Sequence, residues 1–259
     1  MITDARKAEL LSAADLLLKA RKTANPVEDL SAPMLATSLD EAYFVQDAMA
    51  RSLQPEGIID WKVGAPAPDA TPIFGPMIRA WVGADGCTFA DKRYRIRGLE
   101  AEISFKIGKD LPPRATPYSR EEVIDAIESC HPAIEELEAG LMAPAKVARF
   151  TMFSDLQMHG GFIPGPAVAD WQKIDFSKES VALAIDGKIE VVRSASNTAG
   201  TDLLRLVLYL ANEASSRTGG LKRGGWVTTG SWTGNTFAKP GSYVDVRFST
   251  AGGVSLHFA

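Results

Sequence analysis

The chain has 259 residues, of which 46% are hydrophobic and 23% are charged, the balance of an ordinary globular domain. Its net charge of −4 and its pI of about 5.5 give no electrostatic reason to expect nucleic acid or an anionic membrane surface as a partner. No run of 18 apolar residues and no basic-then-apolar start occur, so we expect neither a membrane span nor a signal peptide.

Few cysteines and histidines are available for metal or redox chemistry. Cys87 and Cys130 are the only cysteines, which is too few for a disulfide framework or a zinc motif. We therefore expect a reducing, cytoplasmic location. With only three histidines, a metal would have to be held by carboxylates, which favours a hard ion such as Mg²⁺ or Mn²⁺.

The first fifty-odd residues are predicted to be helical. Over residues 4–22, leucine and alanine recur at helical spacing between charged residues. A second helix should begin at Ser38, because Ser38 and Glu41 form an S-x-x-E capping box. We therefore divide the chain into an N-terminal helical part, residues 1–56, and a β-rich part, residues 57–259.

The β-rich part is predicted to be mostly antiparallel strands with two helices. Asp186-Gly187 supplies the positive φ angles of a two-residue hairpin turn. Ser119 and Glu122 form a second capping box. This pattern predicts an α+β fold, and no nucleotide-binding G-x-G-x-x-G follows a strand. Strands are expected within residues 57–66, 79–89, 94–108, 160–168, 181–192, 224–234, 243–248 and 254–259, helices over 118–130 and 201–217, and a Pro/Gly-rich loop over 69–77.

The stretch "LEAEISFKI", residues 99–107, alternates strictly between apolar and polar residues. On a strand, Glu100 and Glu102 therefore share one face. A solvated edge strand explains this pattern without any function. A metal ion between the two carboxylates also explains it, since a cation removes the repulsion of neighbouring like charges. A third ligand could come from "HPAIEELEAG", where Glu135 follows a buried-looking run and Glu136 and Glu138 are expected on a solvated rim.

Three further segments hold candidate functional groups, each with an ordinary structural alternative. Lys62 lies in the apolar run "IIDWKVG", where a lysine could balance carboxylates or stabilise developing negative charge, although most lysines are solvated. "VTTGSWTG", residues 227–234, could present hydroxyl and N–H groups to a substrate carboxylate, or be a polar turn. Asp155 and His159 in "SDLQMHGG" could transfer protons, or be structural.

Taken in order, several segments resemble one known family. They are "EAYFVQ", "WKVG", "PIFGPM", "GLEAEISFKIGKDL", "HPAIEELE", "SDLQMHGG", "GGWVTTGS" and "AKPGSYVDVRF". The chain from about residue 40 onward resembles the 2-keto-4-pentenoate hydratase and 2-oxo-3-hexenedioate decarboxylase branch of the fumarylacetoacetate hydrolase superfamily. The most specific element is E-x-E followed about thirty residues later by P-A-I-E.

The resemblance implies a fold and a set of site residues. The fold would be a mixed β-roll or β-sandwich core with flanking helices and a small N-terminal helical part. The implied cofactor is Mg²⁺ or Mn²⁺. The implied residues are the metal ligands Glu100, Glu102 and Glu135, the active-site Lys62, and Thr229, Gly230 and Ser231 of a carboxylate-binding turn. We further expect Asp155 or His159 to assist Lys62 in catalysis through water, and Phe74 to bind the substrate.

The resemblance also implies an activity. A glutamate as third ligand is typical of the hydratase and decarboxylase branch, whereas the hydrolases usually have aspartate. We expect a cytoplasmic homo-oligomeric hydratase that adds water to a 2-hydroxy-2,4-dienoate to give a 4-hydroxy-2-oxo acid, in aromatic or related catabolism. Two departures leave alternatives open, because Ile73 replaces a usual acid and Asp155-Leu156 replaces "DN". The alternatives are a metal-dependent 2-oxo-3-hexenedioate-type decarboxylase and a non-catalytic metal- or ligand-binding homologue.

Overall fold

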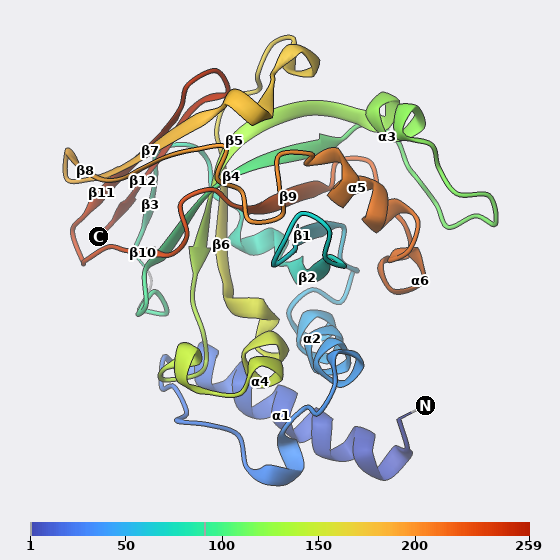
Figure 1. The fold of residues 1–259 in the computed structure, drawn as a ribbon. Helices are drawn as coiled ribbons and strands as arrows, with labels where there is room; N and C mark the ends of the chain where they lie inside the picture. Colours follow the sequence, from blue (N-terminus) through green and yellow to red (C-terminus); the bar gives the residue numbers. More distant parts are fainter. Residues whose placement is uncertain (1, 91) are drawn as a thin grey trace.

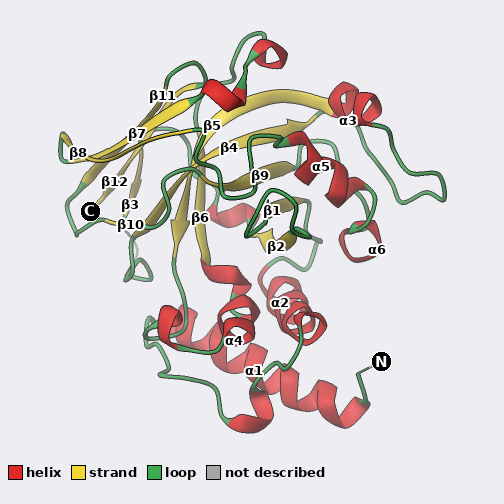
Figure 2. Cartoon of the chain, in the orientation of Figure 1, coloured by secondary structure: helices red, strands yellow, loops and turns green. Residues whose placement is uncertain are grey.

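Two β-sheets form the centre of the molecule, which is a computed structural model describing residues 2–90 and 92–259 (Figures 1 and 2). The strands are β1 Asp60–Gly64, β2 Ile73–Met77, β3 Cys87–Phe89, β4 Gly98–Ile107, β5 Ile127–Leu137, β6 His159–Pro164, β7 Ser180–Ile185, β8 Lys188–Ser194, β9 Trp226–Ser231, β10 Thr236–Phe237, β11 Tyr243–Phe248 and β12 Gly252–Phe258. The larger sheet has the order β2-β1-β9-β4-β5-β6, with β10 paired to β4, and the smaller sheet has the order β3-β12-β11-β7-β8.

Most of the strand pairs are antiparallel, as the sequence predicted. The parallel pairs are β1 with β9 and β3 with β12. The long strand β5 contacts β11 and β12 of the other sheet, so apolar side chains from both sheets share one core. Figure 2 shows this β-rich body with helices at its margin. The predicted α+β class with a β-roll or β-sandwich core is therefore confirmed.

The α-helices lie at the margin of the sheets (Figure 2). They are α1 Asp4–Thr23, α2 Leu39–Leu53, α3 Arg120–Ala126, α4 Arg149–Ser154, α5 Leu204–Ala211 and α6 Ser215–Thr218. Figure 1 shows α1, α2 and α4 together below the strands. Both predicted helix starts are present, since Ser38 and Ser119 accept the N–H groups of Glu41 and Glu122. Within the described residues, no helix combines the length and hydropathy needed to cross a bilayer.

The N-terminal helices and the β-rich part share a hydrophobic cluster. Leu10 and Leu17 of α1 and Met49 of α2 lie in this cluster with Leu141 and Leu156 from the β-rich part. Burial of this apolar face stabilises both elements together. The boundary between residues 56 and 57 stays a prediction, because a shared core does not show which part folds alone.

The prediction of a loop over residues 69–77 was wrong for its second half, because residues 73–77 form β2, which pairs with β1. Pro76 is tolerated there because β2 lies at the edge of the sheet and pairs only with β1, so its missing N–H breaks no ladder. The helix predicted over 118–130 ends at Ala126, where β5 begins, and the helix predicted over 201–217 is interrupted between α5 and α6. Of residues 79–89, only Cys87–Phe89 forms a strand.

Candidate metal centre

Two paired strands bring three glutamates together. In the antiparallel pair of β4 and β5, Glu100 stands opposite Glu135, and Glu102 lies two residues further along the same face of β4. One carboxylate oxygen from each of the three residues lies within 4.8 Å of the others. Like charges placed directly opposite each other destabilise a sheet. The arrangement therefore calls for a compensating positive charge.

The donor atoms of this triad fit a hard divalent ion. Glu102 Oε2 accepts hydrogen bonds from the Thr228 hydroxyl and, at 3.1 Å, from the Gly230 N–H. Glu135 Oε1 accepts from Lys62 Nζ at 2.5 Å. Glu135 Oε2 is buried and has no hydrogen-bond partner among the described residues, although such an atom normally requires one. Three carboxylates and a free buried oxygen suit Mg²⁺ or Mn²⁺, which bind oxygen ligands.

The charges of the triad are unequally stabilised. Burial and the negative charge of Glu135 raise the pKa of Glu100 to about 7. Burial, followed by the charges of Glu135 and Glu100, raises the pKa of Glu102 well above its usual range. Burial also opposes ionisation of Glu135, but Lys62 and His159 outweigh it and lower its pKa. Without a metal ion, Glu135 is therefore the carboxylate that stays charged most readily.

Lys62 is the cation of the site. Its side chain is buried, which by itself would lower its pKa, but the three glutamates more than compensate and raise it. Its ammonium group donates to Glu135 and, at 3.1 Å, to the carbonyl oxygen of Gln157. Two of the three ammonium hydrogens are thus engaged, and the third is available to a ligand.

The triad and Lys62 line a cavity of about 200 Å³. Apart from these charged groups, its lining is apolar or neutral. The neutral amides of Gln157 and Asn235 are its other side-chain hydrogen-bonding groups among the described residues. The remaining lining residues are Val63, Gly64, Leu137, Met152, Phe153, Met158 and Gly230.

The glycine-containing turn lies at the cavity, but its side chains have different roles. Gly230 lines the cavity. Thr229 does not, because its hydroxyl donates to the carbonyl oxygen of Ile103 at 2.6 Å. Ser231 lies close enough to lower the pKa of Glu100. Of the predicted substrate-binding turn, the structure therefore presents mainly backbone to the cavity.

Phe74, Asp155 and His159 lie outside the cavity lining. Phe74 packs on Tyr43 and contributes to a different cavity, on the side of α2 and α6. The Asp155 carboxylate is buried and bound by Arg21 at 2.5 Å and by the Gly140 N–H at 2.7 Å. His159 Nδ1 lies 3.1 Å from Glu135 Oε1, behind the triad. Burial lowers the pKa of His159, so the ring is neutral at pH 7. It lies outside the cavity lining and orients Glu135 through Nδ1.

The expectation of a solvated rim at Glu136 and Glu138 was wrong, since both side chains are buried. β5 lies between β4 and β6, so the C-terminal end of β5 is covered by neighbouring strands and is not exposed to solvent. Glu138 accepts hydrogen bonds from the backbone N–H groups of Arg95, Ile96 and Ala139. Burial, followed by the charge of Glu138, raises the pKa of Glu136 well above its usual range.

Sequence reasoning did not identify the cavity walls formed by Met152, Phe153, Gln157 and Asn235. Met152 and Phe153 belong to α4, which the sequence pattern did not predict. Gln157 belongs to a turn with unusual backbone angles. Asn235 directly follows Gly234, the last residue of the predicted substrate-binding segment, and this position was the one sequence signal for it.

Comparisons with known proteins show the fold. No protein-family model and no curated protein matches the chain. Among solved structures, it is similar to a 4-oxalocrotonate decarboxylase from Pseudomonas putida G7, solved with magnesium and adipate, with a TM-score of 0.83 and 22% identity over 97% of this chain and 98% of that chain. Similarity to a 2-hydroxyhepta-2,4-diene-1,7-dioate isomerase from Mycobacterium marinum gives a TM-score of 0.57 and 14% identity over 78% and 75% of the two chains.

A protein assigned to the fumarylacetoacetate hydrolase family, from Yersinia pestis CO92, matches with a TM-score of 0.60 and 17% identity over 78% of this chain and 93% of that chain. At identities this low, the structural similarity shows a common fold and nothing more. The chain therefore has the fold of the fumarylacetoacetate hydrolase superfamily, as its sequence motifs predicted.

Proposed function

We propose that this protein is a divalent-metal-dependent decarboxylase of a 2-oxo-3-hexenedioate-type acid. The observation that carries this proposal is the composition of the cavity wall. Apart from Lys62 and the three glutamates, its described lining residues include no acid or base. Addition of water needs a group that takes a proton from that water, whereas loss of CO₂ does not. Ile73, which stands where related hydratases have an acid, packs with Met152 and Phe153 of the wall.

The triad and Lys62 would bind the 2-oxo acid end of the substrate. Held by Glu100, Glu102 and Glu135, Mg²⁺ or Mn²⁺ would supply Lewis-acid chemistry that draws electrons toward the C2 oxygen. The bond between C5 and the terminal carboxylate breaks, its electrons form the C4–C5 double bond, and the C3–C4 double bond shifts to C2–C3. The products are CO₂ and, after protonation of the C2 oxygen, a 2-hydroxy-2,4-dienoate.

Lys62 and the apolar wall have complementary roles in this step. Lys62 stays protonated and points into the cavity, where it can stabilise negative charge that accumulates at the C2 end. Met152, Phe153 and Met158 make part of the cavity wall apolar. Such surroundings disfavour a carboxylate more than neutral CO₂, so they favour the reaction in the direction of CO₂ loss.

A second candidate is the hydratase. Gln157 and Asn235 present amides at the cavity, and a pair of amides can hold a water molecule beside a substrate. The same metal-binding groups would serve this reaction, and the two amides would orient the attacking water molecule.

One experiment separates these functions. The protein is incubated with Mg²⁺ and either 2-oxo-3-hexenedioate or 2-hydroxy-2,4-pentadienoate, and ¹³C NMR follows CO₂ release and water addition. The proposal expects CO₂ from the first acid, no water addition to the second, and loss of turnover with a chelator. Formation of a 4-hydroxy-2-oxo acid from the dienoate would favour the hydratase. Metal binding without turnover of either acid would indicate a non-catalytic homologue.

We also propose that the protein forms a homo-oligomer. Several large apolar side chains on the smaller sheet are exposed, namely Ile189 and Val192 of β8 and Tyr243 of β11. Exposed apolar residues on an outer strand are typical of an interface. Light scattering coupled to size exclusion should therefore give a mass above that of a single 27.8 kDa chain.

A further inference from the structure

The turn between α4 and β6 has an unusual backbone. Leu156, Gln157 and Met158 have φ angles of 51°, 52° and 62°, so three consecutive residues with side chains adopt the left-handed conformation. Residues other than glycine usually adopt this conformation singly, because Cβ approaches the backbone. A run of three persists only where the surroundings hold it, and such strain is concentrated at functional sites.

The turn positions several parts of the candidate metal centre. Gln157 and Met158 line the cavity. The carbonyl oxygen of Gln157 accepts from Lys62 Nζ at 3.1 Å. His159, the next residue, places Nδ1 3.1 Å from Glu135 Oε1. A shift of this turn would therefore move both the lysine and the histidine that hold one oxygen of Glu135.

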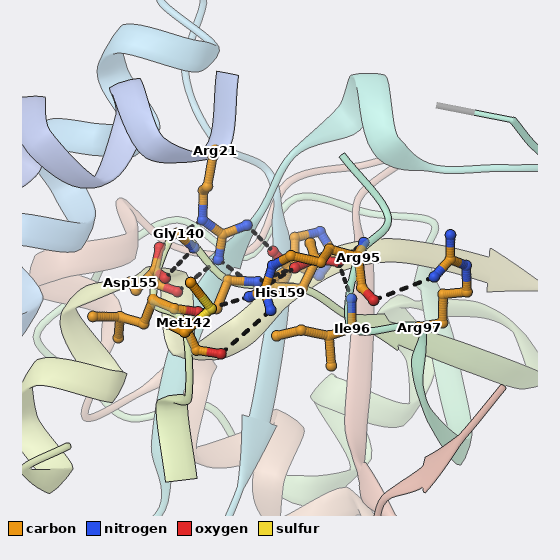
Figure 3. Close-up of polar contacts among 11 residues, drawn as sticks. Arg21, Arg95, Ile96, Arg97, Gly140, Met142, Asp155 and His159 are labelled. Atoms are coloured by element: carbon orange, nitrogen blue, oxygen red, sulfur yellow. Dashed lines mark hydrogen bonds and ion pairs between the residues drawn. The ribbon is translucent and has the colours of Figure 1, made fainter. Parts of the chain in front are cut away.

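One guanidinium group holds both ends of the turn. Arg21, near the end of α1, donates from Nε to Asp155 Oδ1 at 2.5 Å and from Nη2 to the Asp155 carbonyl oxygen at 2.9 Å. It also donates from Nη1 to the His159 carbonyl oxygen at 2.9 Å and from Nη2 to the Glu138 carbonyl oxygen at 2.8 Å. Figure 3 shows Arg21 extending from its helix to Asp155 and His159.

The remaining contacts of this group are consistent with a fixed geometry. The second oxygen of Asp155 accepts the Gly140 N–H, which ties the turn to the segment after β5. The Arg21 side chain is only 8% exposed, and Asp155 is fully buried. Lysine cannot replace such a planar group, because a single ammonium cannot reach all four acceptors in the same directions.

We propose that Arg21 is a positioning residue for the metal centre, acting through the left-handed turn at residues 156–158. The N-terminal helix α1 is then part of the functional site, although it lies more than 130 residues away from the turn in sequence. The inference rests on the proposed function in one respect, namely that Glu100, Glu102 and Glu135 hold a divalent ion.

A matched pair of variants tests this proposal. Arg21→Lys removes the planar guanidinium group and keeps the positive charge. Arg6→Lys is its control, because Arg6 lies on the same helix and likewise binds a carboxylate, that of Glu41, and two backbone carbonyl oxygens, but its partners lie away from the cavity. Free Mn²⁺ is titrated by electron paramagnetic resonance with the full-length chain, and urea unfolding reports the stability of each variant.

We expect Arg21→Lys to weaken Mn²⁺ binding by about 10-fold or more, the usual effect of losing a residue that orients a ligand, and Arg6→Lys to change it by less than about twofold. Unchanged Mn²⁺ affinity in a folded Arg21→Lys protein would overturn the proposal, and so would equal weakening in both variants. If Arg21→Lys does not fold, Asp155→Asn decides by the same criterion.

The Mn²⁺ titration needs no turnover, so its result is independent of the reaction. A wild-type protein that binds Mn²⁺ without decarboxylating would refute the proposed function and leave this test intact. Where turnover is present, Arg21→Lys should lower kcat more than it raises KM, because it moves Lys62 and Glu135, which act on the charge that develops during the reaction.

Discussion

Replacing Glu100 by glutamine should make the metal-free protein more stable at alkaline pH. The pKa of Glu100 is raised from 4.5 to about 7 by burial and by Glu135 across the strand pair. Between these values the folded state binds more protons than the unfolded state, so stability falls as pH rises. The full difference of about 2.5 pKa units corresponds to about 3 kcal/mol above pH 7, and to almost nothing below pH 4.5.

Glu100→Gln removes this cost and keeps the shape of the side chain. In EDTA at pH 8, its free energy of unfolding should exceed that of the wild type by up to about 3 kcal/mol, which corresponds to about 6–12 °C in Tm for a chain of this size. At pH 5 the gain should be small. Equilibrium unfolding in urea at both pH values measures the difference. Glu128→Gln, at the exposed start of β5, is the matched control and should change little.

At pH 8, metal ion should remove most of the stability difference between the two proteins. Mg²⁺ at about 100 times its dissociation constant stabilises a binding protein by about 2.7 kcal/mol, and the variant should lose most of this gain. The assignment of a destabilising charge to Glu100 would be refuted if Glu100→Gln gained equal stability at pH 5 and pH 8, or lost stability at pH 8. Full retention of the Mg²⁺ effect would remove Glu100 from the ligand set.

Two further changes test the site and its supporting structure. Lys62→Met should lower kcat by about 100-fold or more, because the buried ammonium group stabilises developing negative charge; wild-type kinetics would make Lys62 structural. Gly160→Ala should destabilise the protein by about 1–3 kcal/mol in urea, since its Cβ would lie 2.2 Å from Glu136 Oε2 and 2.9 Å from the Glu138 nitrogen. Gly187→Ala, whose Cβ would have open space at a φ of +78°, should lose only about 1 kcal/mol, and a loss as large at Gly187 as at Gly160 would contradict the packing argument.

Local patterns predicted much of the fold because they depend on neighbours in sequence. The alternation of residues 99–107 became β4, and Asp186-Gly187 has the positive φ angles, 52° and 78°, of the predicted hairpin turn. The prediction failed where position in the sheet outweighs composition. Residues 73–77 contain glycine and proline, and they form a strand only because the edge of the sheet needs no donor from Pro76.

The candidate site was predictable only in part, because much of it depends on contacts that are distant in sequence. Motif order indicated Glu100, Glu102, Glu135 and Lys62, and the structure brings them together. The role of Arg21 left no signal, since a buried arginine near a helix end resembles an exposed one in sequence. Asp155 was a candidate for proton transfer on its motif alone, and its partner Arg21 lies 134 residues away.

The choice of Glu135 over its neighbour depends on strand register. Glu135 and Glu136 adjoin on β5 and so point to opposite faces. Because Glu100 pairs with Glu135, a register shift of one residue would put Glu136 beside Glu100 and Glu102. The same shift would turn Glu135 toward Gly160. In the observed register, Oε1 of Glu135 is held by Lys62 and His159 while Oε2 is left without a partner. The sheet thus places two like charges opposite each other, and a divalent ion bound there would turn this unfavourable pairing into binding energy.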